Sequence, residues 1–218
     1  MNTQIIQPIL HKIEPDRQGA RRHYGVHPYF TRRPYNVVRE YIENYSSPGE
    51  KVLDPFGGSG VTAIESFLLS RTGIQNDINP LANFISDGLY LLSKIKQSDI
   101  QDAFAQTIDN ITPLINDLIF LSETELEAQW QSYLSSFSFP PNILLPKNSD
   151  VVSYHDLFTK SQLVSLAVMK SEVEKINDAE IKHIVLLAWS ATLSKINKTF
   201  LSAEGRKESR GGSSIFSI

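Results

Sequence analysis

The spacing of apolar residues in the first half of the chain changes from a helical to a strand-like period and back. A helix is predicted directly after Pro34, which suits a first helical position, and its apolar face would consist of Val37, Val38, Tyr41, Ile42 and Tyr45. Short apolar runs at 51–55 and 74–77 predict buried strands. Because a helical pattern separates these two runs, the strands are expected to be parallel.

Helical patterns follow each predicted strand and then fill the second half of the chain. The helix after the first strand is expected to bury Ala63, Ile64, Phe67 and Leu68, and Pro80 opens another that reaches about Leu92. From Gln97 onward an apolar stripe runs at helical spacing, with Pro113 expected to kink or break it. The stretches "SETE" at 122–125 and "TKSQ" at 159–162 have the capping-box pattern. Two further helices are predicted at 160–176 and 179–198, after a proline-rich loop.

These elements predict three parts: an α/β part at 1–95, a mainly helical part at 96–200, and a flexible tail at 201–218 that ends in an apolar, strand-like run. Only two strands are predicted with a clear pattern, so the sheet is expected to be partial.

Composition narrows the classes of protein. The chain has 218 residues, a net charge of −3 and no cysteine, which excludes disulfides and thiolate metal sites. The N-terminus lacks the apolar core of a signal peptide, and no apolar run is long enough to span a membrane, so a cytoplasmic protein is expected. Arginines cluster near both ends of the chain, whereas 97–146 contains no Lys or Arg, so a polyanion such as DNA would be met by the ends. The N-terminal cluster is Arg17, Arg21, Arg22, Arg32, Arg33 and Arg39, and the tail cluster is Arg206, Lys207 and Arg210.

The stretch "DPFGGSGVTA", residues 54–63, packs three glycines behind an acidic residue that ends a predicted strand. A phosphate-binding P-loop needs Gly-Lys-Ser/Thr at its end, and Val61 follows the last glycine, so that interpretation fails. The order of glycines also satisfies the dinucleotide pattern G-x-G-x-x-A, with Asp77 at a suitable distance. A third interpretation is a loop for S-adenosylmethionine, because a carboxylate placed before the glycines would face the ligand's ammonium and sulfonium groups.

At this point the sequence resembles a known family. "LDPFGGSGVTAIES" resembles the cofactor motif of the amino-group DNA methyltransferases, which modify adenine N6 or cytosine N4. "HPYFTRRPYNVVREYI", residues 27–42, is similar to the segment that precedes this motif in some members, and "NDINPLA" resembles the motif on the second strand. The helices of 154–198 resemble the insertion of a larger subgroup. The resemblance implies a Rossmann-like S-adenosylmethionine methyltransferase sheet, of which part is present, with a mainly helical insertion.

The resemblance also implies a cofactor site. The Asp54 carboxylate would face the charged methionine end, Asp77 would accept from the ribose hydroxyls, and Ile78 would pack on the adenine. The segment around His27 would reach the methionine end. The cofactor-binding residues expected on this basis are His27, Thr31, Asp54, Pro55, Phe56, Gly57, Gly58, Ser59, Gly60, Asp77 and Ile78. No metal ligands are expected, because the histidines show no metal-ligand spacing.

The catalytic motif of this family, D/N/S-P-P-Y/F/W, is not found in the 218 residues. The Pro-Pro pair of "SFPPN" is preceded by Phe139 and followed by Asn142, which supply neither the acceptor for the base amine nor the stacking ring. We therefore expect the cofactor-binding portion of a DNA methyltransferase of a restriction–modification or related system, truncated or split from a second chain that carries the motif. The alternatives are a non-catalytic S-adenosylmethionine-binding module acting through a partner and, third, a dinucleotide-binding oxidoreductase.

Overall fold

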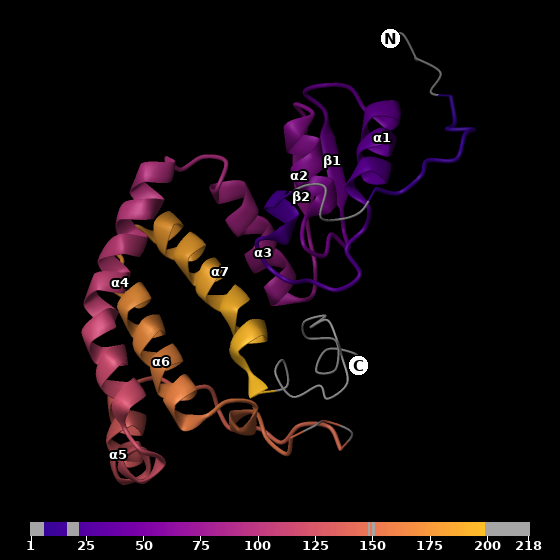
Figure 1. Cartoon of the computed structure of the whole chain (residues 1–218). Helices are drawn as coiled ribbons and strands as arrows, with labels where there is room; N and C mark the ends of the chain where they lie inside the picture. The colour runs from indigo at the N-terminus through magenta and orange to yellow at the C-terminus, as the bar shows by residue number, and fades with distance from the viewer. Residues whose placement is uncertain (1–6, 17–21, 148, 150, 199–218) are drawn as a thin grey trace. The chain divides into compact units, whose positions relative to one another are not determined.

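The computed structural model describes residues 7–16, 22–147, 149 and 151–198. The chain forms two compact units, Met1–Lys94 and Ile95–Ile218 (Figure 1). The strand-like run at the end of the chain and the basic cluster of the tail lie outside the described residues, as do Arg17 and Arg21.

The first unit is an α/β arrangement around two short strands. It contains a 3-10 helix, η2 (Arg22–Gly25), the helices α1 (Tyr35–Tyr45), α2 (Val61–Leu68) and α3 (Pro80–Leu91), and the strands β1 (Lys51–Asp54) and β2 (Thr72–Gln75). The strands pair in parallel, with Lys51 opposite Thr72 and Asp54 opposite Gln75. The predicted parallel pairing is thus confirmed, although β2 begins two residues earlier than expected and ends at Gln75, before Asp77. Pro34 stands one position before the helix, as the N-cap of α1.

Helix α2 is the central element of this unit, since it contacts α1, α3 and both strands. It approaches β2 so closely that a Cβ atom on Gly73 would lie 2.6 Å from the Cα of Ala63. The expected apolar face of α2 is wrong in part, because Phe67 and Leu68 are exposed while Val61, Ile64 and Glu65 are buried. The buried positions follow the side of the helix that meets α1 and η2, where a carboxylate finds polar partners.

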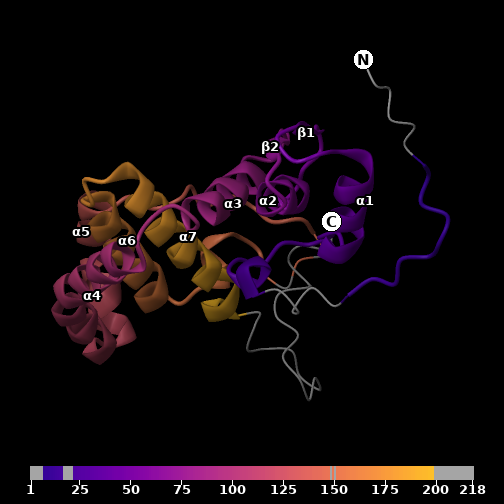
Figure 2. The same cartoon turned by 90° about the horizontal axis from the view of Figure 1, so that it is seen from above.

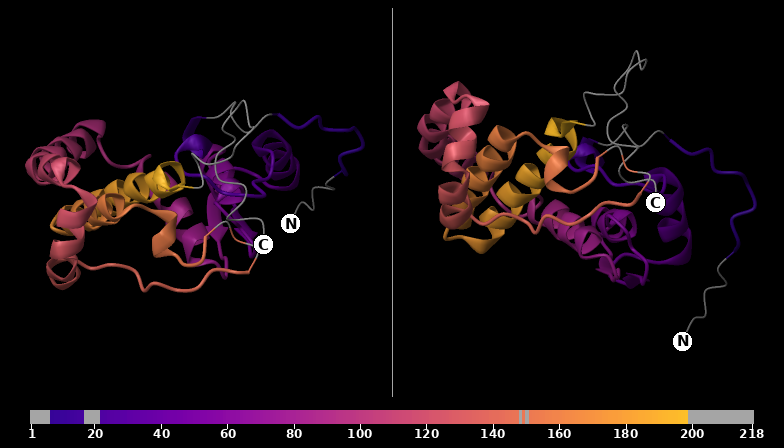
Figure 3. Two further views of the ribbon diagram at one scale, coloured as in Figure 1. Left: turned by 60° about the horizontal axis from the view of Figure 1, so that its bottom comes forward. Right: turned by 90° about the horizontal axis from the view of Figure 1, so that it is seen from below.

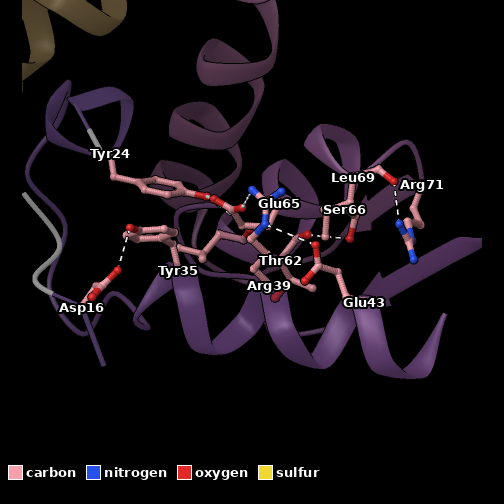
Figure 4. A network of polar contacts seen from close by, with 11 residues as sticks. Asp16, Tyr24, Tyr35, Arg39, Glu43, Thr62, Glu65, Ser66, Leu69 and Arg71 are labelled. Atoms are coloured by element: carbon pink, nitrogen blue, oxygen red, sulfur yellow. Dashed lines mark hydrogen bonds and ion pairs between the residues drawn. The ribbon is translucent and has the colours of Figure 1, made fainter. Parts of the chain in front are cut away.

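Glu65 is the centre of that polar network (Figure 4). Its side chain is fully buried, its Oε1 accepts a hydrogen bond of 2.9 Å from the hydroxyl of Tyr24, and its Oε2 lies 3.5 Å from Nη1 of Arg39. Arg39 also pairs with Glu43 on the same helix, 3.5 Å away. A buried carboxylate is costly unless it is paired and hydrogen-bonded, so these contacts join η2, α1 and α2.

The face of the sheet that points away from α2 has no helix over it in the described part of this unit (Figure 2). Leu53 and Ile74, which are paired in register, project there and are 62% and 41% exposed. A sheet of two strands is marginal by itself, so α2 supplies much of its stability.

The second unit is built of helices (Figure 3). It contains α4 (Gln97–Phe120), α5 (Glu123–Ser136), the 3-10 helix η3 (His155–Leu157), α6 (Lys160–Glu174) and α7 (Ala179–Ile196). Helices α4, α6 and α7 pack against one another, and α5 packs against α6. None of the helices that the structure describes, in either unit, is long and apolar enough to cross a membrane.

The cap predictions for this unit are confirmed, and of the two outcomes expected at Pro113, a kink or a break, the break does not occur. Both predicted capping boxes form, with Ser122 and Thr159 as the N-caps of α5 and α6. Helix α4 continues through Pro113 without a break. Ile111 and Leu118, on either side of this proline, are buried against α5 and α6, and their burial offsets the one backbone hydrogen bond that proline removes.

The core of the second unit consists of two apolar clusters. The first joins α4, α5 and α6 and consists of Ile111, Leu118, Leu126, Val164 and Val168. The second joins η3 to α6 and consists of Leu157, Phe158, Leu163 and Leu166. Trp130 and Phe139 pack against both clusters, so the loop that contains the Pro-Pro pair is attached to this core.

The contact between Gly73 and α2 generates a test of the fold. Gly73→Ala is expected to lower the free energy of unfolding by about 3 kcal/mol, because the added methyl group meets backbone atoms of Ala63 that cannot rotate away. Urea denaturation followed by circular dichroism measures the change. Gly25→Ala is the matched control, since no atom lies within 4 Å of a Cβ there. Equal stability of the two variants would contradict the packing described.

Candidate functional site

The glycine loop connects the end of β1 to the start of α2. Gly60 is the N-cap of α2 with φ 87°, a left-handed conformation that favours glycine, and a Cβ there would lie 2.8 Å from the Cβ of Ser86. The loop closes on itself through a hydrogen bond of 3.0 Å from the Gly60 N–H to the carbonyl of Gly57. The backbone is thus compact, and three of its six residues, 55–60, carry no side chain.

Asp54, at the end of β1, accepts hydrogen bonds from both sides of this loop. Its Oδ1 accepts from the backbone N–H of Phe56 at 3.1 Å, and its Oδ2 accepts from the hydroxyl of Thr62 at 2.6 Å. The carboxylate therefore links β1 to the first turn of α2. Each carboxylate oxygen has a second lone pair, so this role leaves room for a ligand donor.

Asp77, just after β2, holds the middle of the same loop. Its Oδ2 accepts from the backbone N–H of Gly58 at 2.8 Å, and its Oδ1 accepts from the N–H of Asn79 at 2.8 Å. The side-chain amide of Gln75 donates to the carbonyl of Gly58 at 2.8 Å. The loop is thus fastened to the ends of both parallel strands, which lie at the same edge of the sheet.

The segment 29–33, which precedes α1, lies beside the glycine loop and lines the same cavity. A Cβ on Gly58 would lie 3.4 Å from the ring of Tyr29. Burial raises the pKa of the Tyr29 hydroxyl, and the negative charge of the Asp77 carboxylate raises it further. Thr31 has a left-handed backbone with φ 58°, a strained conformation for a β-branched residue.

These walls enclose a cavity of about 340 Å³. The cavity brings together seven of the predicted cofactor residues, namely Thr31, Asp54, Phe56, Gly57, Gly58, Ser59 and Asp77. It is also lined by five residues that were not predicted as cofactor contacts, namely Tyr29, Arg32, Arg33, Val61 and Thr62. Thr62 could have been found from the sequence, since a hydroxyl in the first turn of the helix is well placed to meet the acidic residue before the loop.

Four predicted residues lie outside this lining. His27 is buried, and its Nδ1–H donates to the carbonyl of Pro28 at 2.7 Å. Gly60 is the N-cap of α2, at the end of the loop. Pro55 is exposed, and the side chain of Ile78, expected to pack on an adenine ring, is 100% exposed next to Asp77.

Two arginines of the N-terminal cluster are engaged inside the protein. The guanidinium of Arg32 donates to Ser59 and to backbone carbonyls, and Arg39 pairs with Glu43 and Glu65. Of the arginines whose side chains the structure describes in that cluster, Arg33 is the exposed one. Of these three arginines, Arg33 is therefore the one left as a candidate for the expected contact with DNA.

Larger hollows lie elsewhere on the described residues. One of about 1020 Å³ runs along α1 and β1 and is mostly apolar, and one of about 920 Å³ lies beside α2 and α3. Neither contains Asp54, Asp77 or the glycines of the loop. No group of three or more potential metal ligands occurs within the described ranges.

The part of the chain that contains this loop is similar to known proteins. Residues 7–85 match a family model described as DNA methylase, of the N6/N4 type. A stretch of 86 residues is 26% identical to the Type II methyltransferase M.MjaII of Methanocaldococcus jannaschii. That stretch is 39% of this chain and 15% of the relative, so the chain spans a small part of the length of that protein. No solved structure matches.

The resemblance to the amino-group DNA methyltransferase family is thereby confirmed for residues 7–85. This range includes the cavity and both carboxylates, and it ends within α3.

The buried imidazole of His27 generates a prediction about pH. Burial, followed by the positive charge of Arg32, lowers the pKa of His27 below its usual 6.5. The unfolded chain then binds the proton more readily than the folded one. The contribution of the neutral His27 to the free energy of unfolding is therefore complete above pH 6.5 and is lost as the pH falls through the pKa of the folded state.

His27→Asn removes this contribution. The free energy of unfolding, measured by urea denaturation between pH 7.5 and 5.5, should fall less steeply with decreasing pH in His27→Asn than in the wild type. Identical slopes for the two proteins would show that His27 is not the group responsible.

Proposed function

We propose that the first unit binds S-adenosyl-L-methionine in the cavity between the glycine loop and the segment 29–33. The observation that carries this proposal is a glycine-rich loop hydrogen-bonded to two carboxylates, Asp54 and Asp77, within residues that match the DNA methylase family. The cavity volume of about 340 Å³ falls in the range of small-molecule sites, which is about 300–1,000 Å³.

The lining also has the charges that this cofactor requires. The ligand carries an ammonium, a sulfonium and a carboxylate, and the cavity presents Asp54 and Asp77 together with the exposed Arg33. The loop itself favours glycine at both positions, because a Cβ on Gly57 would lie 2.7 Å from the side chain of Gln75 and Gly58 has a left-handed backbone with φ 56°. The residues present therefore fit the group.

Within this proposal, Asp54 faces the charged methionine end and Asp77 accepts from the ribose hydroxyls, in addition to the loop hydrogen bonds that they already make. Thr31, Phe56 and Ser59 complete the wall, and the fully exposed Ile78 packs on the adenine. Three further predicted residues act indirectly: His27, Pro55 and Gly60 shape the segments from which the cavity is built. The unit would then be the first part of a Rossmann-like methyltransferase sheet, with the helical unit as an insertion.

The cofactor supplies an activated methyl group, and we propose that its acceptor is the exocyclic amine of adenine or cytosine in DNA. A base that reacts in this way must leave the stack and be held by an acceptor and a stacking ring. The tetrapeptide that provides both in this family is not found among the 218 residues. We therefore propose that methyl transfer requires a segment outside these residues, on the same polypeptide or on a second chain.

Binding of the cofactor provides the first test. Isothermal titration of S-adenosylmethionine into the purified chain is expected to show one site, with NAD giving no heat. Asp77→Ala is expected to weaken binding by about tenfold or more, since a carboxylate that pairs with ligand hydroxyls and holds the loop is lost.

Asp87→Ala is the matched control, because this exposed carboxylate on α3 lies outside the cavity lining. Its affinity should equal that of the wild type. Binding of NAD in place of S-adenosylmethionine would favour the dinucleotide interpretation, and a folded chain that binds neither would contradict the proposal.

Methyl transfer provides the second test. The chain alone, incubated with DNA and S-adenosylmethionine carrying a radioactive methyl group, is expected to leave the DNA unlabelled. Adding a polypeptide that contains D-P-P-Y or S-P-P-Y and completes the site should produce labelled DNA. Rapid labelling by the chain alone would overturn the proposal that the motif is supplied from elsewhere, and a chain that binds the cofactor but completes no enzyme would favour the non-catalytic module.

Contact with DNA is proposed through Arg33 and the basic tail. If these side chains bind phosphates, the affinity of the chain for duplex DNA should fall steeply between 50 and 200 mM salt in a filter-binding titration. An affinity that is insensitive to salt would exclude this mode of contact.

A further inference from the structure

Arg32 connects the segment before α1 to the glycine loop, since it bonds to Ser59, which lies 27 positions further along the chain. Its Nε donates to the hydroxyl of Ser59 in the glycine loop at 2.8 Å. Its Nη1 donates to the carbonyl of Tyr24, and its Nη2 donates to the carbonyl of His27 at 3.1 Å. Because the guanidinium group is planar and rigid, these three contacts define the position of the segment relative to the loop.

The other end of this segment is anchored on α2. Tyr24 is completely buried, and its hydroxyl donates to Glu65, as Figure 4 shows. The stretch from Tyr24 to Arg32 is therefore attached to α2 at its start and to the glycine loop at its end. Between these attachments it carries Tyr29 and Thr31, both of which line the cavity.

We infer that Arg32 is a positioning residue for the cofactor site, which holds the segment 29–31 across the glycine loop through its hydrogen bond to Ser59. This inference rests on the proposed function, since the cofactor concerned is S-adenosylmethionine. It assigns to Arg32 a role inside the protein, in place of the phosphate contact that its membership of an arginine cluster suggests.

The chain contains a matched arginine away from the cavity. Arg71 donates through Nε to the hydroxyl of Ser46 at 3.1 Å, through Nη1 to the carbonyl of Leu69 at 2.7 Å, and through Nη2 to the carbonyl of Ser46 at 2.6 Å. It thus bonds to one serine hydroxyl and two carbonyls, as Arg32 does. Arg71 is not among the residues that line the cavity.

The experiment compares Arg32→Gln with Arg71→Gln in the full chain. Three quantities are measured: the melting temperature, the Kd for S-adenosylmethionine by calorimetry, and amide hydrogen exchange at Gly57–Gly60 without ligand. Both variants are expected to melt at a lower temperature than the wild type. Only Arg32→Gln should bind the cofactor about tenfold more weakly and exchange its loop amides faster.

Two further variants test the route through Ser59. Arg32→Lys keeps the positive charge but lacks the rigid guanidinium group, so its affinity for the cofactor should be almost as weak as that of Arg32→Gln. An affinity equal to that of the wild type would mean that the charge alone matters. In the double variant Arg32→Gln/Ser59→Ala, the loss of affinity should match that of the larger single loss, because both changes remove the same hydrogen bond between Nε of Arg32 and the hydroxyl of Ser59. Additive losses would show that Arg32 acts on the ligand separately and would overturn the inference.

The exchange measurement separates this inference from the proposed function. If the wild type does not bind S-adenosylmethionine, the proposed function fails, but faster exchange of the loop in Arg32→Gln than in Arg71→Gln would still establish the positioning role. Equal exchange in these two variants would refute the positioning role even if the wild type binds the cofactor. If Arg32→Gln does not fold, Arg32→Lys and Ser59→Ala provide the same comparison.

Discussion

Two carboxylates hold the glycine loop in place, and the candidate site depends on this arrangement. Asp54 accepts from the backbone of Phe56 and from Thr62, and Asp77 accepts from the backbone of Gly58. Because parallel strands end at the same edge of a sheet, both carboxylates reach one loop from neighbouring strands. The pairing of β1 with β2 and the packing of α2 on both strands are what bring the two groups to that edge.

This arrangement gives each carboxylate a structural and a proposed chemical role. A loop with little side-chain packing has few other means of staying folded, so hydrogen bonds to charged acceptors contribute a large share of its order. In the proposed function, Asp54 would face the cationic part of the ligand and Asp77 would accept from its ribose hydroxyls. The shape of the loop and the charge of the cavity are therefore set by the same two residues, and a change at either one alters both.

Much of this architecture could be predicted from local patterns. The two strands, their parallel pairing, both capping boxes and the family of residues 7–85 follow from short motifs whose meaning does not depend on distant residues. The burial of Glu65 and the exposure of Phe67 could not be predicted, because the apolar pattern of α2 does not reveal that Tyr24 and Arg39 are available as partners. The hydrogen bonds of Arg32 could not be predicted for the same reason. Its acceptors are a distant serine hydroxyl and backbone carbonyls, and the latter leave no trace in the amino-acid sequence.

The close approach of β2 to α2 has a consequence for the evolution of this gene. Every missense change in a glycine codon introduces a Cβ atom, and at position 73 that atom would overlap the backbone of Ala63. At Gly57 the atoms in the way belong to the side chain of Gln75, which can move only by giving up its hydrogen bond to the carbonyl of Gly58. Selection for the fold alone thus preserves codon 73, whereas a change at codon 57 could be tolerated if position 75 changed with it. Substitutions at codon 57 would therefore be expected together with substitutions at codon 75, while codon 73 stayed unchanged.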